Sequence, residues 1–196
     1  MERSPELHSR KQQIIQTAAK LFRKNGFKGT SLKSIAEEMG IKTPSLYNHI
    51  ASKNEILSHL LLTNANTFHL RMEEIQKANI DSLQKLDRII SLHIELTLQN
   101  PDAMGLMLND WVHLDPKDRE EYLELREKYE QNFLSILQQC IDKGQLVPMN
   151  TNLMLFIILS TLRSLYAWCT RYRDFNRIEL ENSVKTGLLE GLLNKY

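Results

Sequence analysis

Residues 31–50 read SLKSIAEEMGIKTPSLYNHI, and this stretch decides the fold. Two short segments with apolar residues at helical spacing, Leu32–Met39 and Leu46–Ile50, lie on either side of Gly40. A glycine between two helices allows the left-handed backbone conformation that a sharp turn needs. The pattern therefore predicts a helix-turn-helix, a unit that places its second helix in the major groove of DNA. From these residues alone, an ordinary capped helical hairpin is the alternative.

The chain before this stretch predicts a first helix with one apolar face. This helix extends from about Ser9 to Asn25, and Gly26 ends it. Either Thr30 or Ser31 can then cap the second helix, because a hydroxyl at the N-cap accepts a hydrogen bond from a free backbone N–H. The helix-turn-helix is thus expected to rest on a third helix that precedes it.

The chain after Gly40 also carries clear helix signals. Thr43 before Pro44 predicts an N-cap followed by proline at the first helical position, in a short helix that ends near Ile50. The segment Ser52–Glu55 is a capping box, in which the serine and the glutamate each satisfy the other's backbone N–H. A long fourth helix is expected to follow and to end at about Lys77.

Side chains suited to DNA gather around the second helix of the pair. Leu46 and Ile50 are four residues apart and are expected to face the core, which turns the polar residues between them outward. Ser, Thr and Asn can bond base edges, proline offers an apolar surface to a thymine methyl, and tyrosine or lysine can donate to phosphates. The candidate DNA-binding residues are Thr30, Ser31, Lys33, Lys42, Thr43, Pro44, Ser45, Tyr47, Asn48, His49 and Lys53.

The distribution of charge agrees with this prediction. Residues 1–56 contain ten Lys and Arg against five Asp and Glu, a net charge of +5, whereas the remainder carries −4. A basic head on a mildly acidic body indicates that only the head meets a polyanion.

The rest of the chain shows apolar residues at helical spacing and no sustained strand-type alternation, so the predicted fold class is all-α. We expect a helix-turn-helix DNA-binding domain over residues 1–55 and a helical ligand-binding and dimerisation domain over residues 56–196. The five further helices predicted cover residues 82–99, 101–108, 116–143, 151–173 and 177–194.

Several classes of protein do not fit the sequence. It contains no phosphate-binding glycine loop, nucleophile elbow or metal-protease motif, so we expect no enzyme, no cofactor and no metal site. The longest unbroken apolar run, Leu153–Leu159, is too short to span a bilayer, and the polar N-terminus lacks a signal-peptide core. Cys140 and Cys169 stand alone, as is usual in a reducing compartment. We therefore expect a cytoplasmic protein without a membrane partner.

The stretch Ile14–Leu57 resembles the N-terminal domain of the TetR family of transcriptional regulators. The shared motifs are Ala18-Ala19-x-Leu21-Phe22, Gly26-Phe27-x-x-Thr30-Ser31, Ile35-Ala36-x-x-x-Gly40-Ile41, Leu46-Tyr47 and Ser52-Lys53-x-Glu55. The chain departs from the family pattern at Ile50, where an aromatic residue is common, and at Thr43–Ser45, where a glycine is more usual; the second departure leaves the base preference open. The resemblance implies a homodimeric cytoplasmic repressor that binds a double-stranded palindromic operator and is controlled by a small-molecule effector.

The resemblance also implies that the last two long helices pair with those of a second copy. Apolar residues exceed what one helical hairpin needs, although burial within the monomer is the alternative for each. The residues of these two faces, apolar apart from Ser160, are Leu153, Phe156, Ile157, Ser160, Leu165 and Tyr166 on one helix, and Val184, Leu188, Leu189 and Leu192 on the next.

The middle of the body carries soft, aromatic and cationic residues that could line a ligand pocket or fill the core. Those chosen as candidate ligand-binding residues are Met104, Met107, Trp111, Arg126, Tyr129, Phe133, Arg163 and Trp168. Arg163 lies in an apolar helix and needs an anionic partner, because an unpaired buried charge is very costly. That partner is either a carboxylate of the chain, such as Glu95, Asp110 or Glu130, or an anionic ligand.

The segment Asp115–Tyr172 is similar to TetR-family regulators that respond to fatty-acyl or steroid-derived acyl-CoA. The similarity rests on Arg126-x-x-Tyr129-Glu130, on Gly144-x-Leu146, and on a helix that carries Arg163, Trp168 and Tyr172. It implies an acyl-CoA effector. The alternative function is that of a helical interaction protein that has lost DNA binding.

Overall fold

The computed structural model describes residues 10–172, 174–190 and 192–193, and in this part of the chain the fold is all-α, as predicted. Within it, the one β-type contact is an isolated bridge between Leu146 and Leu193. The elements are α1 (Arg10–Asn25), α2 (Leu32–Glu38), α3 (Thr43–Tyr47), α4 (Lys53–Lys77), α5 (Ser82–Gln99), α6 (Pro101–Asn109), the 3-10 helix η1 (Trp111–His113), α7 (Pro116–Asp142), α8 (Thr151–Arg171) and α9 (Arg177–Leu189).

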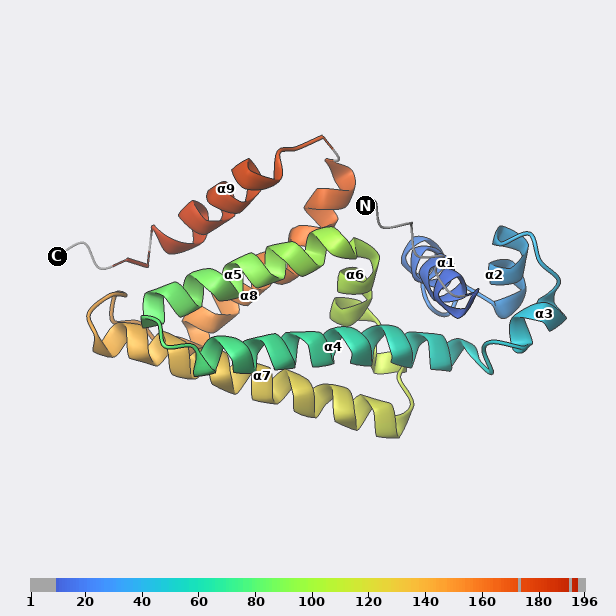
Figure 1. Ribbon diagram of the computed structural model, residues 1–196, viewed down its shortest axis with the longest axis horizontal. Helices are drawn as coiled ribbons and strands as arrows, with labels where there is room; N and C mark the ends of the chain where they lie inside the picture. Colours follow the sequence, from blue (N-terminus) through green and yellow to red (C-terminus); the bar gives the residue numbers. More distant parts are fainter. Residues whose placement is uncertain (1–9, 173, 191, 194–196) are drawn as a thin grey trace, which may run out of the picture.

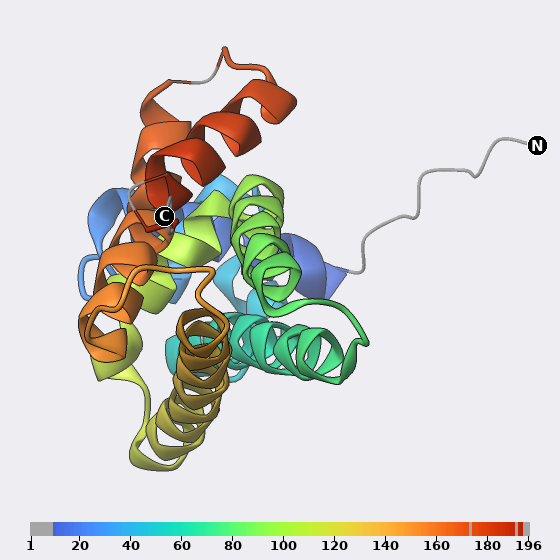
Figure 2. The ribbon, with the colours of Figure 1, turned by 90° about the vertical axis from the view of Figure 1, so that its left-hand side faces the viewer.

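The helices form a small head at one end of an elongated body. Helices α1, α2 and α3 make the head, and α4 leaves it to run along the body beside α7 (Figure 1). Viewed along the body, α4, α5, α7 and α8 surround a common centre, with α9 on the outside (Figure 2). Predicted boundaries agree with the observed ones to within about two residues for α1, α2, α4, α5, α6, α7 and α8; the predicted starts or ends at Ser9, Arg173 and Asn194 lie outside the described residues. The prediction that the last helix continues toward Asn194 is wrong, because α9 ends at Leu189 and Glu190, Leu192 and Leu193 are not helical.

Two buried apolar clusters hold these parts together. The body cluster lies among α4, α5, α7, α8 and α9 and includes Met104 of α6. The head cluster includes Leu46 and Ile50, which are 0% and 1% exposed as the sequence predicts, and it extends into the body through Ala103 and Leu106 of α6. The head is therefore packed directly on α6. The domain boundary expected at residues 55 and 56 falls in the first turn of α4, a helix that serves both clusters.

The third helix differs from its prediction at both ends. Thr43 is its first residue and Lys42 occupies the N-cap without a side-chain hydrogen bond, so the prediction that Thr43 caps this helix is wrong. The extended backbone of Lys42, with φ −76° and ψ 139°, starts the helix one residue early. Pro44 is still within the first turn, where its missing N–H costs nothing. The helix ends at Tyr47 instead of near Ile50.

The two serine caps differ in how completely they match expectation. Ser31 is the N-cap of α2 and forms a reciprocal box with Ser34, which decides between Thr30 and Ser31. At α4, the hydroxyl of Ser52 accepts from the N–H of Glu55 as predicted. The carboxylate of Glu55, however, accepts from the N–H of Ala51 at 2.7 Å. The predicted box is therefore only half formed.

Helix α8 is more apolar than its longest unbroken run indicated. An 18-residue window in it has a mean hydropathy of 1.5, so by length and composition alone this one described helix could cross a membrane, a test that core helices of soluble proteins also pass. Only 33% of that window is buried in the monomer. Leu153, Phe156 and Ile157 are 51%, 66% and 40% exposed. Leu165, by contrast, is buried within the monomer, as are Leu188 and Leu192 of the following segment.

Helices α6 and α8 approach closely at Gly105. A Cβ atom added there would lie 2.7 Å from Cε2 of Tyr166, which is closer than such contacts occur. We expect Gly105→Ala to lower the free energy of unfolding by about 1–3 kcal/mol, because it forces the two helices apart. Urea unfolding followed by circular dichroism measures this change.

The matched control is Gly187→Ala in α9, where an added Cβ meets nothing within 4 Å. This change is expected to leave stability unchanged or to raise it by up to about 1 kcal/mol, since alanine favours helices more than glycine does. Equal stabilities for the two variants would contradict the close packing of α6 on α8.

Candidate functional site

The surface of the head that carries α3 is polar and open. Pro44, Ser45, Tyr47, Asn48 and His49 are all exposed, and Tyr47 is 56% exposed in spite of its aromatic ring. Beneath them, Leu46 and Ile50 fix the helix on the head core. This arrangement presents hydroxyl, amide and phenol groups outward from a rigid support, which is the chemistry that reads base edges and holds phosphates. The remaining candidates on this surface are Ser31, Lys33 and Lys42, which are exposed, and Thr43, which is half-buried.

Thr30 is placed differently from its prediction. Its side chain is buried, and its hydroxyl donates to the carbonyl oxygens of Gly26 at 3.0 Å and Leu21 at 3.2 Å. The hydroxyl therefore closes the loop between α1 and α2, and the prediction that Thr30 offers it to DNA is wrong.

Lys53 is also bound within the protein. Its Nζ donates to the carbonyl oxygens of Phe27 at 2.6 Å and Thr30 at 2.9 Å, and it lies 4.3 Å from the centre of the Phe27 ring. Partial burial lowers the pKa of this amine. Lys53 thus ties the start of α4 to the α1–α2 loop, and two of its three N–H donors are already used. The expectation of a freely flanking lysine is corrected: only one N–H is left for a phosphate.

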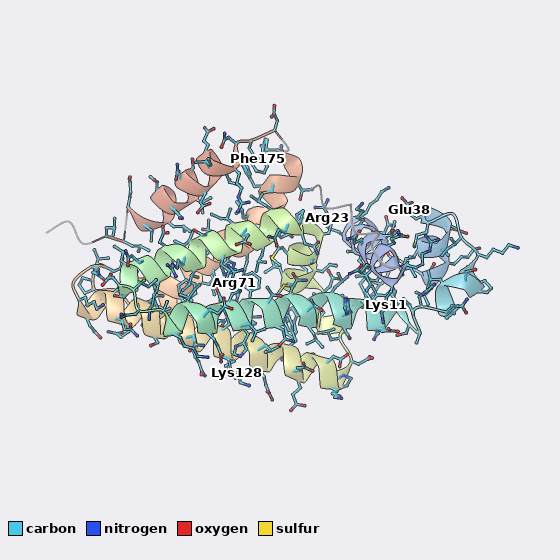
Figure 3. The ribbon with its side chains drawn as sticks, viewed as in Figure 1. Lys11, Arg23, Glu38, Arg71, Lys128 and Phe175 are labelled. Atoms are coloured by element: carbon cyan, nitrogen blue, oxygen red, sulfur yellow. The ribbon has the colours of Figure 1, made fainter. Side chains whose placement is uncertain are left out.

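The head is joined to the body at both ends of α6. Arg23 of α1 pairs with Asp102 at 2.7 Å and donates to the hydroxyl of Thr170 at 2.6 Å, and Figure 3 shows it between the head and α6. Beyond the other end of α6, the ring of Phe27 stacks on His113 of η1, with centroids 5.4 Å apart. A movement of α6 therefore acts on the head at two points.

The same helix α6 forms one wall of a cavity in the body. The cavity has a volume of about 110 Å³ and lies among α4, α5, α6, α7 and α8. Most of its wall is apolar, and the polar groups are His93, two tyrosines and two arginines. The full lining is Ala65, Phe68, His93, Met104, Met107, Leu108, Tyr122, Leu125, Arg126, Tyr129, Leu162 and Arg163. A partly open, mostly apolar space with a few polar groups is the usual character of a small-molecule site. Its volume is below the roughly 300–1,000 Å³ of most ligand sites, so a larger ligand must extend out through the open side.

Five of the eight candidate ligand residues meet in this cavity: Met104, Met107, Arg126, Tyr129 and Arg163. The other three do not line it. Phe133 is fully buried in the body core, and Trp111 stacks on Tyr122 with ring centroids 6.5 Å apart. Trp168 is 41% exposed and packs on Tyr172 and Phe175, so it lies on the surface.

Several of the lining residues are not among those predicted from the sequence to bind a ligand. Helical spacing does point to Tyr122, because Tyr122, Arg126 and Tyr129 are four and three residues apart and so lie on one face of a helix. Its hydroxyl donates to the carbonyl oxygen of Met107 at 2.9 Å, which ties α7 to α6. Phe68 and His93 come from other helices, and only the packing of these helices brings them to the site.

The two arginines of the cavity share one carboxylate. Arg163 Nη2 lies 2.5 Å and Arg126 Nε 3.0 Å from the same oxygen of Glu130, so Glu130 is the intramolecular partner of Arg163. Burial acts to raise the pKa of Glu130, but the hydrogen bonds from the two arginines outweigh it and lower the pKa. The side chains of Arg126, Glu130 and Arg163 are 39%, 28% and 29% exposed. The group thus carries a net positive charge within reach of solvent.

A second polar pair lies on the buried side of the cavity. Nε2 of His93 and the hydroxyl of Tyr129 are 2.7 Å apart, and the ring of Phe68 packs on both. Burial, together with the nearby charge of Arg163, lowers the pKa of His93 to about 3, and burial raises the pKa of Tyr129. Both side chains are therefore neutral at physiological pH.

Two family models match the chain. The model for bacterial regulatory proteins of the tetR family matches residues 14–60, and the one for the tetracyclin repressor-like C-terminal domain matches residues 79–172. Together they cover the head surface and all of the cavity lining except Ala65 and Phe68 of α4.

Individual proteins agree with these matches. The HTH-type transcriptional repressor KstR2 of Mycobacterium tuberculosis (strain ATCC 25618 / H37Rv) is 26% identical over 144 residues, which are 73% of this chain and 72% of KstR2. The fatty acid metabolism regulator protein of Bacillus subtilis (strain 168) is 27% identical over 192 residues, 93% of this chain and 95% of the relative.

Solved structures share the fold. The structure of KstR2 from Mycobacterium tuberculosis superposes with a TM-score of 0.88 at 20% identity, covering 99% of this chain and 100% of that one. The structure of AibR in complex with isovaleryl coenzyme A and operator DNA superposes with a TM-score of 0.76 at 20% identity, covering 91% and 97%.

Proposed function

Because the chain belongs to the TetR family of transcriptional regulators, we propose that it is a repressor that binds a palindromic operator as a homodimer and leaves it when a small molecule binds the body. The observation that carries this proposal is the position of α6. This helix lines the cavity through Met104 and Met107 and holds the head through the Arg23–Asp102 ion pair. An effector can therefore act on the head through one rigid element. We assign DNA binding to residues 1–55 and effector binding and dimerisation to residues 56–196, in the cytoplasm.

The homodimer is supported by the apolar face of α8. Leu153, Phe156 and Ile157 are exposed together over about one turn, and Ile178 at the start of α9 is 70% exposed. Surface of this kind usually marks an interface. A second copy would cover it, and two heads on one two-fold axis would match the two halves of a palindrome.

On the operator, we assign the exposed residues of the head to two tasks. Pro44, Ser45 and Asn48 face the base edges in the major groove, where they can select a sequence. The other candidates on this surface contact the phosphates and so fix the position of the head along the DNA. They are Thr43, Tyr47, His49, Lys33, Lys42 and the N-terminal residues of α2.

For the effector, we propose an acyl-CoA. The apolar wall suits an acyl chain, and Arg126 and Arg163 can donate charge-assisted hydrogen bonds to the thioester carbonyl at the start of that chain. A relative is named for fatty acid metabolism, and AibR, of the same fold, was solved with isovaleryl coenzyme A. The larger hollow of about 440 Å³ between α1, α4 and the start of α6 is lined mainly by polar residues and suits an acyl chain less well.

Release then follows from a shift of population. A ligand that binds better to the body conformation in which the heads are wrongly spaced draws the protein away from DNA. Met104 and Met107 would sense the ligand, and Arg23 and Phe27 would pass the displacement of α6 to the head.

The direct test is to recover the genomic fragments that the purified protein binds. We expect the fragments to share one palindrome, and acyl-CoA to release them in a gel shift. Recovery of no specific fragment would contradict the proposal and favour a helical interaction protein that has lost DNA binding.

Substitutions on α3 test the division of tasks on the operator. We expect Ser45→Ala and Asn48→Ala each to relax base preference at one position of the half-site, at a cost of about 1–3 kcal/mol for each lost base contact. Tyr47→Phe is expected to weaken binding to all sequences equally, because its hydroxyl serves a phosphate. Competition of the variants among half-site libraries measures both effects. Unchanged affinity and preference in all three variants would show that α3 is not the reading helix.

A further inference from the structure

The cavity has two polar regions of different kinds. The group Arg126–Glu130–Arg163 is partly exposed and charged, whereas His93 and Tyr129 are each 5% exposed and neutral. Side chains of Phe68, Met104 and Leu162 are among those that make up the apolar wall. A thioester carbonyl that accepts hydrogen bonds from the arginines would therefore bring the acyl chain that follows it toward the buried pair.

The hydrogen bond between His93 and Tyr129 leaves the tyrosine hydroxyl able to make one further hydrogen bond. If the tyrosine donates to Nε2, its oxygen can still accept a hydrogen bond; if Nε2–H donates, the tyrosine O–H is free to donate. Both residues line the cavity, so a bound ligand can reach this capacity. A ligand hydroxyl group both donates and accepts, so it can bond to Tyr129 in either arrangement. A ligand carbonyl oxygen can do so only when Nε2–H donates to Tyr129 and the tyrosine O–H is free.

An unsubstituted acyl chain suits the apolar part of the wall but is a poor match for the His93–Tyr129 pair. It would displace any water from the pair and leave the free donor or acceptor without a partner, and such a group is expensive to bury. The neutrality of His93 also makes the pair unsuited to an anionic group, which the arginines accommodate better.

We propose that the His93–Tyr129 pair recognises a hydroxyl group on the apolar part of the effector, so that the effector is a hydroxylated acyl compound. This inference rests on the proposed function, because it deepens the assignment of the same cavity. Tyr129 is then the residue that determines specificity, and the arginines supply affinity that is common to all acyl-CoA ligands.

The experiment is calorimetric titration of the full chain with matched acyl-CoA esters, from butanoyl to dodecanoyl. Each length is used unsubstituted, with a hydroxyl near the thioester, with a hydroxyl near the chain end, and with an oxo group at the same two positions. We expect one hydroxylated ester to bind at least about tenfold more tightly than its unsubstituted counterpart, as one satisfied buried hydrogen bond would give. If the oxo ester binds as tightly as the hydroxylated one, the Tyr129 hydroxyl donates to the ligand. If the oxo ester binds no more tightly than the unsubstituted one, the Tyr129 oxygen accepts from the ligand hydroxyl.

The variant Tyr129→Phe should remove this preference and leave affinity for the unsubstituted ester unchanged or higher. The matched control is Tyr122→Phe, because Tyr122 lines the same cavity but donates its hydroxyl to the Met107 carbonyl. This control should keep the ratio of affinities between hydroxylated and unsubstituted esters. The ratio in the unaltered protein remains decisive should a variant fail to fold.

Two failures are distinguishable. Equal affinity of the unaltered protein for hydroxylated and unsubstituted esters at every length would overturn this inference and leave the acyl-CoA proposal standing. Binding of no ester at all, in a protein that still binds its operator, would contradict the acyl-CoA proposal and this inference together.

Discussion

The variant Arg163→Met is expected to bind operator DNA normally but to stay on it at effector concentrations that release the unaltered protein. Arg163 faces the cavity and is bonded to Glu130, which also accepts from Arg126 at 3.0 Å. After the substitution, Glu130 keeps this second partner, so no carboxylate is left unpaired and the fold is preserved. Methionine retains the apolar stem that packs on the wall. A charge-assisted hydrogen bond to the ligand is lost, which lowers effector affinity about 10- to 150-fold.

Fluorescence anisotropy of labelled operator DNA, titrated with acyl-CoA, measures this effect. The matched control is Arg71→Met, which removes an arginine of α4 that pairs with Glu74 and Glu95 outside the cavity (Figure 3). It should respond as the unaltered protein does. Loss of operator binding or of the folded state in Arg163→Met would instead assign the Arg163–Glu130 pair to stability, and a normal response would place the thioester elsewhere.

The helices could be predicted because their signals are local. Gly26 and Gly144 take positive φ angles of 76° and 66° where the sequence places helix ends, and Ser31 and Ser52 cap the helices that follow them. Each of these signals depends on a few neighbouring residues. The one-residue error at Thr43 has the same origin, since a hydroxyl before proline fits both the cap and the first helical position.

The roles of Thr30 and Lys53 could not be predicted, because their partners are distant in sequence. Lys53 bonds to carbonyls 23 and 26 residues away, and nothing near it in the chain indicates this. A polar residue in a DNA-binding head has two uses, outward to phosphates or inward to loop carbonyls. Only the packing of α1 against α4 decides between them.

The cavity was predicted in part for a similar reason. Arginine in an apolar helix indicates a paired site, and this located Arg163 and its partner among three acidic residues. Aromatic residues carry no such signal. Phe133 and Tyr129 lie one turn apart on α7, yet the first fills the core and the second borders the cavity. Which aromatic residue meets empty space depends on how five helices pack, and periodicity along one of them cannot show it.

The substitution Phe156→Glu is expected to produce a monomer that binds the operator at least 100-fold more weakly. Phe156 is 66% exposed in the middle of the apolar face of α8, so the monomer loses little when it becomes charged. In a dimer, the glutamate of each protomer would be buried in an apolar interface, and burying unpaired charges there is very costly. The two heads would then separate. Linkage of two heads in a dimer raises affinity for the full operator by about 10²–10⁴, because the second head binds at a high effective concentration, and the monomer lacks this gain.

Sedimentation equilibrium gives the oligomeric state, and a gel shift on full and half operators gives the affinity. The control is Leu70→Glu, which places the same charge on a leucine of α4 that is 58% exposed. We expect this control to remain dimeric, because exposure of a single apolar side chain is common on protein surfaces and marks no interface. If Phe156→Glu remains a dimer with full operator affinity, the subunits meet elsewhere. If it is monomeric but binds the full operator as before, one head is sufficient, and the second half-site contributes nothing to the free energy of binding. The expected result is weak and equal binding to full and half operators. It would show that the α8 interface joins two weakly binding heads into one selective repressor.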